Sequence, residues 1–318
     1  MGTGPQILIF GFLISNLYAL VAVGFTMIFG VARVLNLAHG ALVLIGGYVA
    51  ILLYTSGDTN IRLPQGGLEA WLGPELGLPL AILGAVAATT LFAMGLYVFL
   101  VRRVQDKPIT VFMTTLLVGV IVEEFISWSF SSNARGLNLE GFVTSILDNF
   151  EVVRELGLEQ GVPFFGIILT HTRIFASLAT LVVMAALWYF VNRTRTGKAI
   201  MATSMDAMGS ALVGVNARRI QLITWAISGV FAALSGIFLA SFLGTSPIGG
   251  RLPLVIAFTI VVLGGLGSIQ GSLLAAYLVG YTETITTQLM SPTYRGFPSL
   301  IILVLVLLWR PQGLMGKE

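Results

Sequence analysis

Long, continuously apolar segments recur along the whole 318-residue chain, and they constrain its fold more than any other feature. Within a bilayer every backbone polar group needs an internal partner, which leaves only helices or closed barrels. Because these segments are continuously apolar rather than alternating, the sequence excludes a barrel and predicts an all-α polytopic protein, a bundle of about 8–10 transmembrane helices. The predicted spans are 6–29, 41–54, 78–101, 109–130, 174–191, 220–242, 252–263, 272–288 and 297–309.

The composition agrees with a chain that lies almost entirely in a membrane. Hydrophobic residues make up 56% of the chain and charged residues 10%, whereas about a quarter of a soluble protein is charged. Spans of about 20 residues leave no room for a separate soluble domain, so residues 1–318 are expected to form a single transmembrane domain. The N-terminus lacks the basic region of a signal peptide, and its apolar run is too long for one, which predicts an uncleaved first span. The absence of cysteine excludes disulfides and thiolate metal sites.

Basic residues cluster in three connections and indicate the topology. These connections contain Arg102, Arg103, Lys107, Arg193, Arg195, Lys198, Arg218, Arg219, Arg310 and Lys317. The loops 55–77 and 131–173 contain only Arg62, Arg135, Arg154 and Arg173, beside Asp58, Glu69, Glu75, Glu140, Asp148, Glu151, Glu155 and Glu159. Ten basic residues against four predict that the three connections are cytoplasmic and the two loops extracytoplasmic, with the N-terminus outside and the C-terminus inside. The pI near 9.3 therefore does not indicate a nucleic-acid partner.

Two predicted spans are too short to cross a bilayer, and both adjoin glycine-containing segments. At 1.5 Å per residue, 41–54 covers about 21 Å and 252–263 about 18 Å, against a hydrocarbon core of about 30 Å. The adjoining segments are Gly30–Gly40 and Gly264–Gly271. Such a pair, one in each half of the chain, indicates a substrate pathway. The residues predicted to line it are Asn36, His39, Gly40, Gly264, Gly265, Gly267, Ser268 and Gly271; a helix-end hydrogen bond is the alternative role for His39.

Small residues recur at every fourth position in three of the spans. The stripes are Ala81, Ala85, Thr89 and Ala93; Ser228, Ala232, Gly236 and Ala240; and Ser272, Ala276, Gly280 and Thr284. Small residues let helix backbones approach closely in lipid, where no hydrophobic incentive drives helices together. The stripes therefore predict the packing faces of a compact bundle and carry no information about chemistry.

The long polar interval Thr194–Arg219 predicts a short amphipathic helix over 197–213. Met201, Met205, Met208, Leu212 and Val215 recur at steps of four and three, which places them on one helical face. Thr196 is positioned to cap the start of this helix, and Gly214 to end it in a left-handed conformation. We interpret the helix as a docking element at the cytoplasmic surface; an amphipathic segment resting on lipid is the alternative.

Three acidic residues, Glu123, Glu124 and Glu283, fall inside predicted spans. Charge at the bilayer centre costs about 2.5–3.5 kcal/mol on insertion scales, so such residues usually face a bundle interior or water. No Lys or Arg partner lies within these spans. Ion coupling through these carboxylates remains an alternative mechanism.

No catalytic constellation is found in the sequence. Gly197-Lys198 is followed by Ala199, and Asn192 stands where a phosphate-binding loop has its first glycine, so this motif for ATP hydrolysis is missing. His39 and His171 are far apart in the sequence and lack ligand companions. His171 is expected to be an ordinary interfacial residue. Of the functional classes considered, a membrane enzyme has the least support in the sequence.

Four segments resemble the H-type permease subunit of the high-affinity branched-chain amino acid ABC importers. They are Asn36–Ala50, with the N-[FL]-A-H-G signature; Thr194–Ala199 followed by Ala202, Asp206, Leu212, Gly214 and Val215; Val262–Gly280, with a glycine-rich signature; and Arg310–Leu314. The resemblance covers nearly the whole chain in order and spacing. Departures are Met205, where many relatives carry an acidic residue, Ala41, where Glu is common, and a long acidic loop 131–173.

The resemblance implies a two-permease, two-ATPase importer in the cell membrane, fed by an extracytoplasmic substrate-binding protein. ATP and Mg would then be bound by the ATPase subunits and no cofactor or metal by this chain, and the second permease would be a paralogue. The residues implied in ATPase coupling are Thr196, Gly197, Lys198, Met201, Met205, Asp206, Met208, Leu212, Gly214 and Val215.

Branched-chain or related amino acids are the expected substrates. Urea, short amides and sugars are alternatives within the same class of permease, although the Asn36–Gly40 segment argues against a sugar. An ion-coupled secondary transporter is the alternative from another class, with Glu123, Glu124 or Glu283 as the coupling residue.

Overall fold

The computed structural model of the protein describes residues 3–56, 58, 60–131, 133–137, 139–140, 142–143, 162–164, 167–310 and 312–315. The main helices are α1 (Thr3–Ala32), α2 (His39–Tyr54), α3 (Leu68–Gly95), α5 (Pro108–Phe130), α8 (His171–Arg193), α11 (Ala217–Leu243), α12 (Arg251–Gly264), α13 (Ile269–Leu289) and α14 (Phe297–Trp309). A π-helical segment, Leu96–Val101, and α4 (Arg102–Val104) continue α3, while α9 (Arg195–Met205) and α10 (Ala207–Leu212) follow α8. The prediction of an all-α polytopic protein is confirmed.

The loop 131–173 is described only in part. It contains a small antiparallel hairpin of β1 (Val162–Phe164) and β2 (Ile167–Leu169), in which Val162 pairs with Leu169. Residues 144–161, with the acidic Asp148, Glu151, Glu155 and Glu159 and the basic Arg154, lie outside the described residues, as does Lys317 near the C-terminus.

Each predicted span falls on a helix, but the helices differ in length and polarity. Among the described residues, six helices are long and apolar enough to cross a membrane: α1, α3 with its continuation, α5, α8, α11 and the segment 292–309 that contains α14. As predicted, α2 and α12 are short, with 16 and 14 residues. α13 has 21 residues, but its Thr, Tyr, Gln and Glu side chains make it less apolar. The number of helices that cross the membrane, about 8–10, stays a prediction.

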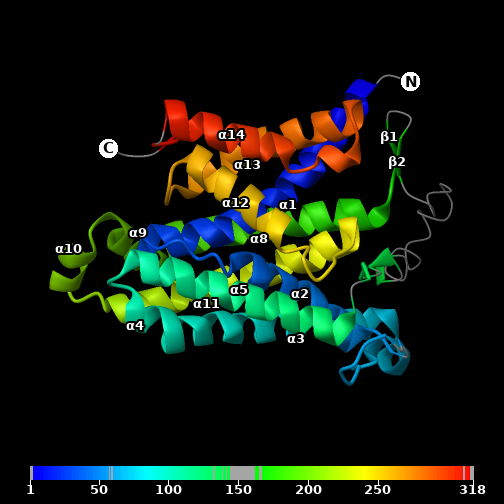
Figure 1. Cartoon of the computed structure of the whole chain (residues 1–318), viewed down its shortest axis with the longest axis horizontal. Helices are drawn as coiled ribbons and strands as arrows, with labels where there is room; N and C mark the ends of the chain where they lie inside the picture. The colour runs from blue at the N-terminus through cyan, green and yellow to red at the C-terminus, as the bar shows by residue number, and fades with distance from the viewer. Residues whose placement is uncertain are drawn as a thin grey trace.

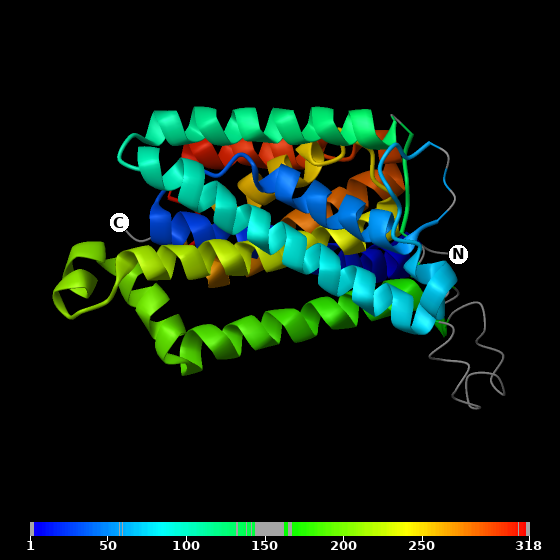
Figure 2. The ribbon, with the colours of Figure 1, turned by 90° about the horizontal axis from the view of Figure 1, so that it is seen from below.

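The helices of the bundle run between two opposite ends (Figures 1 and 2). At one end lie α4, α9, α10 and the C-terminus, and at the other lie the N-terminus and the β-hairpin. The basic connections therefore gather at a single end, which we call the basic end. The N- and C-termini lie at opposite ends, as expected if they lie on opposite sides of the membrane.

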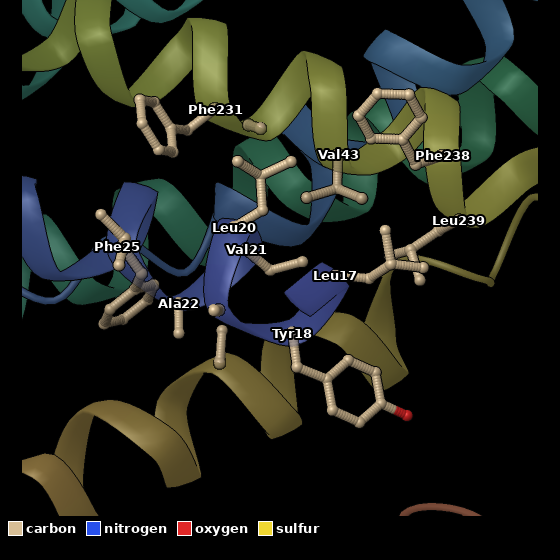
Figure 3. Packing of buried hydrophobic residues seen from close by; sticks show 14 of the residues in the cluster. Leu17, Tyr18, Leu20, Val21, Ala22, Phe25, Val43, Phe231, Phe238 and Leu239 are labelled. Carbon is tan, nitrogen blue, oxygen red and sulfur yellow. The ribbon is translucent and has the colours of Figure 1, made fainter. Parts of the chain in front are cut away.

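The centre of the bundle is built around α1. Its Leu17, Leu20 and Phe25 side chains interleave with Val43 of α2 and Phe231 of α11 (Figure 3). Polar contacts join α1 to its other neighbour, α13. The Thr26 and Ser272 hydroxyls lie 2.7 Å apart, and the Tyr277 hydroxyl donates to Asn16 Oδ1 at 2.5 Å.

All three stripes of small residues are buried at helix contacts, as predicted. A Cβ atom at Gly236 of α11 would overlap the Val43 carbonyl oxygen of α2. A Cβ atom at Gly229 would lie 2.8 Å from the Thr90 Cα of α3, and a Cβ atom at Gly280 of α13 would lie 2.8 Å from the Ser15 Cα of α1. Backbone-to-backbone approach therefore sets the spacing of these helices.

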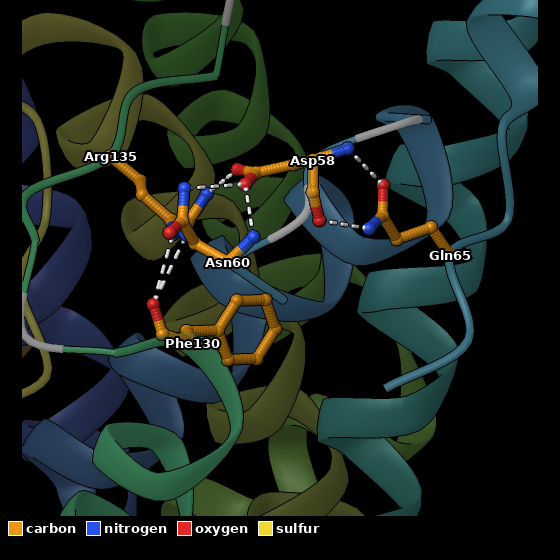
Figure 4. A network of polar contacts seen from close by, with 5 residues as sticks. All are labelled: Asp58, Asn60, Gln65, Phe130 and Arg135. Atoms are coloured by element: carbon orange, nitrogen blue, oxygen red, sulfur yellow. Dashed lines mark hydrogen bonds and ion pairs between the residues drawn. The ribbon is translucent and has the colours of Figure 1, made fainter. Parts of the chain in front are cut away.

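A polar network ties the loops together at the end opposite the basic end (Figure 4). Arg135 pairs with Asp58 and donates from Nη2 to the Phe130 carbonyl at 3.1 Å. Gln65 donates to the Asp58 carbonyl at 2.6 Å and accepts its N–H at 3.0 Å. The Arg135 backbone also exchanges hydrogen bonds of 2.7 and 2.6 Å with Thr245. The network thus holds the segment that leads from α11 to α12.

Candidate functional site

The turn between α8 and α9 is fixed by one side-chain cap and one glycine. Thr194 Oγ1 accepts the Gly197 N–H at 2.9 Å, so Thr194 caps α9. The expectation that Thr196 is the cap is wrong, because the helix already begins at Arg195. A Cβ atom at Gly197 would overlap the Phe190 carbonyl oxygen, so glycine allows α9 to fold back closely against α8.

The single helix predicted over 197–213 is instead two helices that meet at Asp206. This residue is extended, with φ −145°, and its Oδ1 accepts the Met208 N–H at 3.0 Å, which caps α10. Asp often interrupts a helix in this way, because its short carboxylate accepts hydrogen bonds from nearby backbone N–H groups in place of the helical carbonyl acceptors. Gly214 follows α10 with φ +88°, the predicted left-handed conformation. Asp206 therefore holds the break while its side chain stays exposed.

Four of the five stripe residues are exposed on the surface of α9 and α10: Met201 (41%), Met205 (64%), Met208 (78%) and Leu212 (85%). Lys198 is exposed as well. Val215 differs, because it is half-buried and packs against the core. On the other face of α9, Gly197, Ile200 and Thr203 are buried. The segment is thus anchored by one face and presents a flexible apolar surface on the other.

Arg33 joins the segment after α1 to the end of α9. Its φ is +53°, and its Nη2 lies 3.4 Å and 3.5 Å from the carbonyl oxygens of Met205 and Ser204. A cation is favoured at a helix C-terminus, where the last carbonyls lack helical partners. Sequence analysis missed this contact, although Arg33 is the only charged residue of Gly30–Gly40. The predicted docking and pathway segments are therefore in contact.

Asn36 and His39 lie buried at the start of α2, with 1% and 0% exposure. Asn36 Oδ1 accepts the Ala38 N–H at 3.2 Å, and His39 Nε2 lies 3.0 Å from the Val21 carbonyl oxygen of α1. Val21 lies well inside α1, so this contact joins two helices and is not the helix-end hydrogen bond expected as the alternative role of His39. Asn36 Nδ2 and His39 Nδ1 have no hydrogen-bond partner within the described structure.

Gly40 meets Gly250, a residue that sequence analysis did not single out. A Cβ atom at Gly40 would overlap the Gly250 carbonyl oxygen, and a Cβ atom at Gly250 would lie 2.6 Å from the Gly40 carbonyl oxygen. Gly250 directly precedes α12, so the two short helices begin at one backbone contact. Neither start has a side-chain cap. The available signal was the Gly249-Gly250 pair before a short apolar span.

The second glycine segment folds around two close backbone contacts. Gly264 and Gly271 touch each other, and a Cβ atom at Gly267, which has φ +87°, would lie 3.2 Å from the Gly30 Cα. Ser268 caps α13 by accepting the Gly271 N–H at 3.0 Å. The Gly30–Gly267 contact joins the two glycine-containing segments to each other.

The C-terminal segment covers the end of α12. A Cβ atom at Gly313, which has φ +75°, would lie 2.5 Å from the Gly265 nitrogen. The N–H groups of Leu314 and Met315 donate to the carbonyls of Leu263 and Gly264 at 2.7 and 3.0 Å. The eight predicted pathway residues therefore form two groups, with Asn36, His39 and Gly40 around the start of α2, where Gly40 meets Gly250, and the others at the C-terminal end of α12.

Glu283 closes the turn between α13 and α14. It is 2% exposed, its Oε2 accepts the Gly296 N–H at 2.9 Å, and its Oε1 accepts the Ser299 hydroxyl at 2.5 Å. These bonds satisfy a buried carboxylate within the chain. Among the described residues, no group of three or more His, Cys, Asp or Glu side chains is placed to hold a metal ion.

Glu123 of α5 forms an ion pair with Arg251, the first residue of α12. Arg251 Nη2 and Nε donate to Glu123 Oε2 at 2.7 and 2.9 Å. No Lys or Arg lies within the spans that contain Glu123, Glu124 and Glu283, but Glu123 finds a basic partner on another helix, because α12 begins at Arg251 and not at Leu252. Glu124 is exposed.

A cavity of about 340 Å³ opens at the end opposite the basic end. It is lined by Leu137, Leu139 and Phe242 on the apolar side and by Thr172 and Arg173 on the polar side. The Arg173 guanidinium lies 5.1 Å from the centre of the Phe10 ring and 5.2 Å from that of Phe242. His171 begins α8 at this end.

Comparison with known proteins adds an independent line of evidence. Residues 7–307 match the family described as the branched-chain amino acid transport system / permease component. The chain is 28% identical to the high-affinity branched-chain amino acid transport system permease protein BraD of Pseudomonas aeruginosa, over 98% of this chain and 95% of that protein. It is 27% identical to the permease protein LivH of Escherichia coli K12, over 96% of this chain and 94% of that protein. Identity to the permease protein LivM of the same strain is 27%, over 95% of this chain and 68% of that protein.

Proposed function

This chain belongs to the family of permease components of branched-chain amino acid transport systems, and on that premise we propose that it is the translocating subunit of an ATP-driven amino acid importer. Separate ATPase subunits bind ATP and Mg and supply the energy, while this chain binds no cofactor. LivH and LivM are both permease proteins of the high-affinity branched-chain system in one strain. We therefore propose a paralogous permease as the second membrane subunit.

The observation that carries this proposal is the exposed apolar surface of α9 and α10. Met205, Met208 and Leu212 are each more than 60% exposed, whereas the opposite face of α9 is buried against the bundle. Large apolar side chains that gather at an exposed surface mark a site of contact with another molecule. Thioether side chains suit a groove whose shape changes during an ATP cycle.

The charge of the two ends supports the orientation. We place the basic end in the cytoplasm of a cell membrane, since Lys and Arg are retained on that side. The ATPases then bind at α9 and α10. The extracytoplasmic binding protein delivers the amino acid at the opposite end, where the cavity beside Arg173 opens.

Movement of α9 has a direct structural route toward the predicted pathway. Arg33 binds the last carbonyls of α9, and it follows α1 directly, close to the Gly30–Gly267 contact. When the ATPases close and displace α9, Arg33 would be displaced as well. The Gly30–Gly267 contact and the buried Asn36, which lies three residues after Arg33, would then move with it. Because ATP can drive import only if it favours one conformation over the other, α9 must occupy different positions in the inward-open and outward-open states.

Uptake of radiolabelled leucine by cells that carry the complete transport system tests this proposal. Asp206→Arg should reduce uptake more than tenfold while the protein still inserts into the membrane. Asp206→Asn keeps the helix cap but removes the charge. Normal uptake in Asp206→Asn would mean that Asp206 acts as the cap that holds the break between α9 and α10. Reduced uptake would mean that its charge contacts the ATPase. Uptake by the unmodified system that persists without the ATPases would contradict the proposed function.

A further inference from the structure

We propose that Arg251 and Glu124 bind the carboxylate and the ammonium group of the transported amino acid, and that Glu123 neutralises Arg251 when no substrate is present. This inference deepens the proposed function and rests on it. It names the residues that recognise the two charges shared by every α-amino acid.

These charges lie at the depth of the membrane. Glu123 is the sixteenth of the 23 residues of α5, or about 23 Å along a helix of about 34 Å at 1.5 Å per residue. The helix extends about 10 Å beyond it, so Glu123 and Glu124 fall within the hydrocarbon thickness of about 30 Å. Arg251 reaches the same depth, because it pairs with Glu123.

Two of these three charges, those of Arg251 and Glu124, are open to the surroundings of the chain. The side chain of Arg251 is 66% exposed, whereas that of Glu123 is 14% exposed. Glu124 follows Glu123 and is exposed. Ionised groups at this depth face a bundle interior or water and not lipid. The surface formed by α5 and the start of α12 therefore faces water or the interior of the assembled transporter, and we place the substrate path there; α5 runs along the upper edge of the bundle in Figure 2.

The N-terminal ends of α2 and α12 add partial positive charge to this surface, in addition to the charge of Arg251. Both helices begin without a side-chain cap at the Gly40–Gly250 contact. A helix N-terminus carries about half a positive charge and attracts carboxylates. The start of α2 lies against the middle of α5, because a Cβ atom at Gly119, the twelfth residue of α5, would lie 4.0 Å from the Ala38 Cα.

Two buried polar atoms at this place lack partners. Asn36 Nδ2 and His39 Nδ1 belong to the residues that lead into α2, and neither has a hydrogen-bond partner among the described residues. Buried polar groups in proteins are nearly always paired, and an unpaired one calls for an explanation such as a water, an ion or a functional role. The His39 ring lies against Val21 and Phe25 of α1. Asn36, next to the Leu37–Thr115 contact with α5, is therefore the residue that can offer a polar group to a ligand that enters between α2, α5 and α12.

The ion pair leaves room for a second carboxylate on Arg251. A guanidinium has five N–H donors, and Glu123 engages the donors of Nε and Nη2 through one oxygen. The remaining donors belong to a side chain that is largely exposed. Glu124 supplies the opposite charge for the ammonium group, and Val120, one helical turn earlier, is 46% exposed beside it. An amino acid with an apolar side chain matches this combination.

Uptake of radiolabelled leucine by the complete transport system, with this chain carrying substitutions, tests the assignment. Arg251→Gln and Glu124→Gln should each reduce uptake more than tenfold, and Arg251→Lys should restore part of it. Co-purification of the other subunits should be unchanged in all three. Glu75→Gln, which removes an exposed carboxylate from the first part of α3, is the matched control and should transport normally.

The double variant Glu123→Gln/Arg251→Gln separates binding from a structural ion pair. If Arg251 binds substrate, the double variant should assemble and still fail to transport. Recovery of uptake in the double variant, or normal uptake in either single variant, would overturn the inference. Loss of co-purification in the Glu124 or Arg251 variant would also overturn it, because these charges would then pair with the second permease. Failure of the unmodified system to take up leucine would instead contradict the proposed function.

Discussion

The core of the bundle and the α9–α10 segment use small and large residues in opposite ways. In the core, small residues such as Gly236 and Gly280 bring backbones together, and large side chains of α1 fill the spaces between helices. In α9 and α10 the small Gly197 is buried, whereas Met208 and Leu212 are 78% and 85% exposed. The core contacts are made within the chain, whereas the α9–α10 surface is the one that we propose an ATPase subunit covers.

The surroundings of the two regions explain this difference. Lipid tails are as apolar as Leu, so helices in a membrane associate through close packing rather than through removal of apolar area from water. At an aqueous surface each square ångström of apolar area that is removed from water contributes about 25 cal/mol. Exposed Met and Leu side chains at the basic end therefore favour binding of a partner, while small residues in the core favour folding. Substitutions should affect stability in one region and coupling in the other.

The largest loss of stability is expected for Gly236→Leu. Its Cβ would overlap the Val43 carbonyl, and a backbone group cannot turn aside as a side chain can. Overpacking costs about 1–3 kcal/mol, and this site should reach or exceed the upper end. Thermal unfolding of the purified protein in detergent should show a large decrease in Tm. Gly4→Leu is the control, since no atom lies within 4 Å of a Cβ at Gly4. Equal stability of the two variants would mean that α11 and α2 do not approach this closely.

A smaller loss is expected for Thr194→Ala, at the junction of the two regions. This change removes the hydroxyl that accepts the Gly197 N–H, and loss of such a cap costs about 0.5–2 kcal/mol. Thr196→Ala, two residues later, should have almost no effect, because Thr196 is not the cap. Hydrogen exchange of the α9 amides would measure the difference. Faster exchange in Thr196→Ala than in Thr194→Ala would reverse the assignment of the cap.

The smallest effect on stability, within about 0.5 kcal/mol, is expected for Met208→Asp. The side chain is exposed in the isolated chain, but a charge on this surface should weaken ATPase binding and reduce leucine uptake more than tenfold. Met290→Asp places the same change on a Met that is 68% exposed at the end of α13, and ATPase binding should remain normal there. Normal uptake and ATPase co-purification in Met208→Asp would remove α9 and α10 from the docking surface.

Sequence patterns predicted the features that depend on neighbours in the chain. The spacing of small residues identified the buried faces of α3, α11 and α13, because a helix places every fourth residue near the same face. The lengths of two apolar runs predicted the short α2 and α12. Gly214 was identified as a left-handed residue, since only glycine adopts that conformation freely.

Features that depend on precise helix ends were missed. Thr194 and Thr196 both suit a cap, and only the position of α9 against α8 selects Thr194. Asp206 is compatible with a continuous helix as well as with a break. Arg251 was left outside the predicted spans because its apolar run begins at Leu252, so its pairing with Glu123 could not be foreseen.

The sequence by itself determined that this chain is an all-helical membrane protein, which helix faces are buried and which end of the bundle is basic. Composition, residue periodicity and charge are properties of neighbouring residues along one chain. Only the tertiary structure decided that Gly40 meets Gly250, that Arg33 binds the end of α9 and that Arg251 pairs with Glu123. These contacts join residues that are far apart in the sequence, and they depend on how the helices cross in three dimensions.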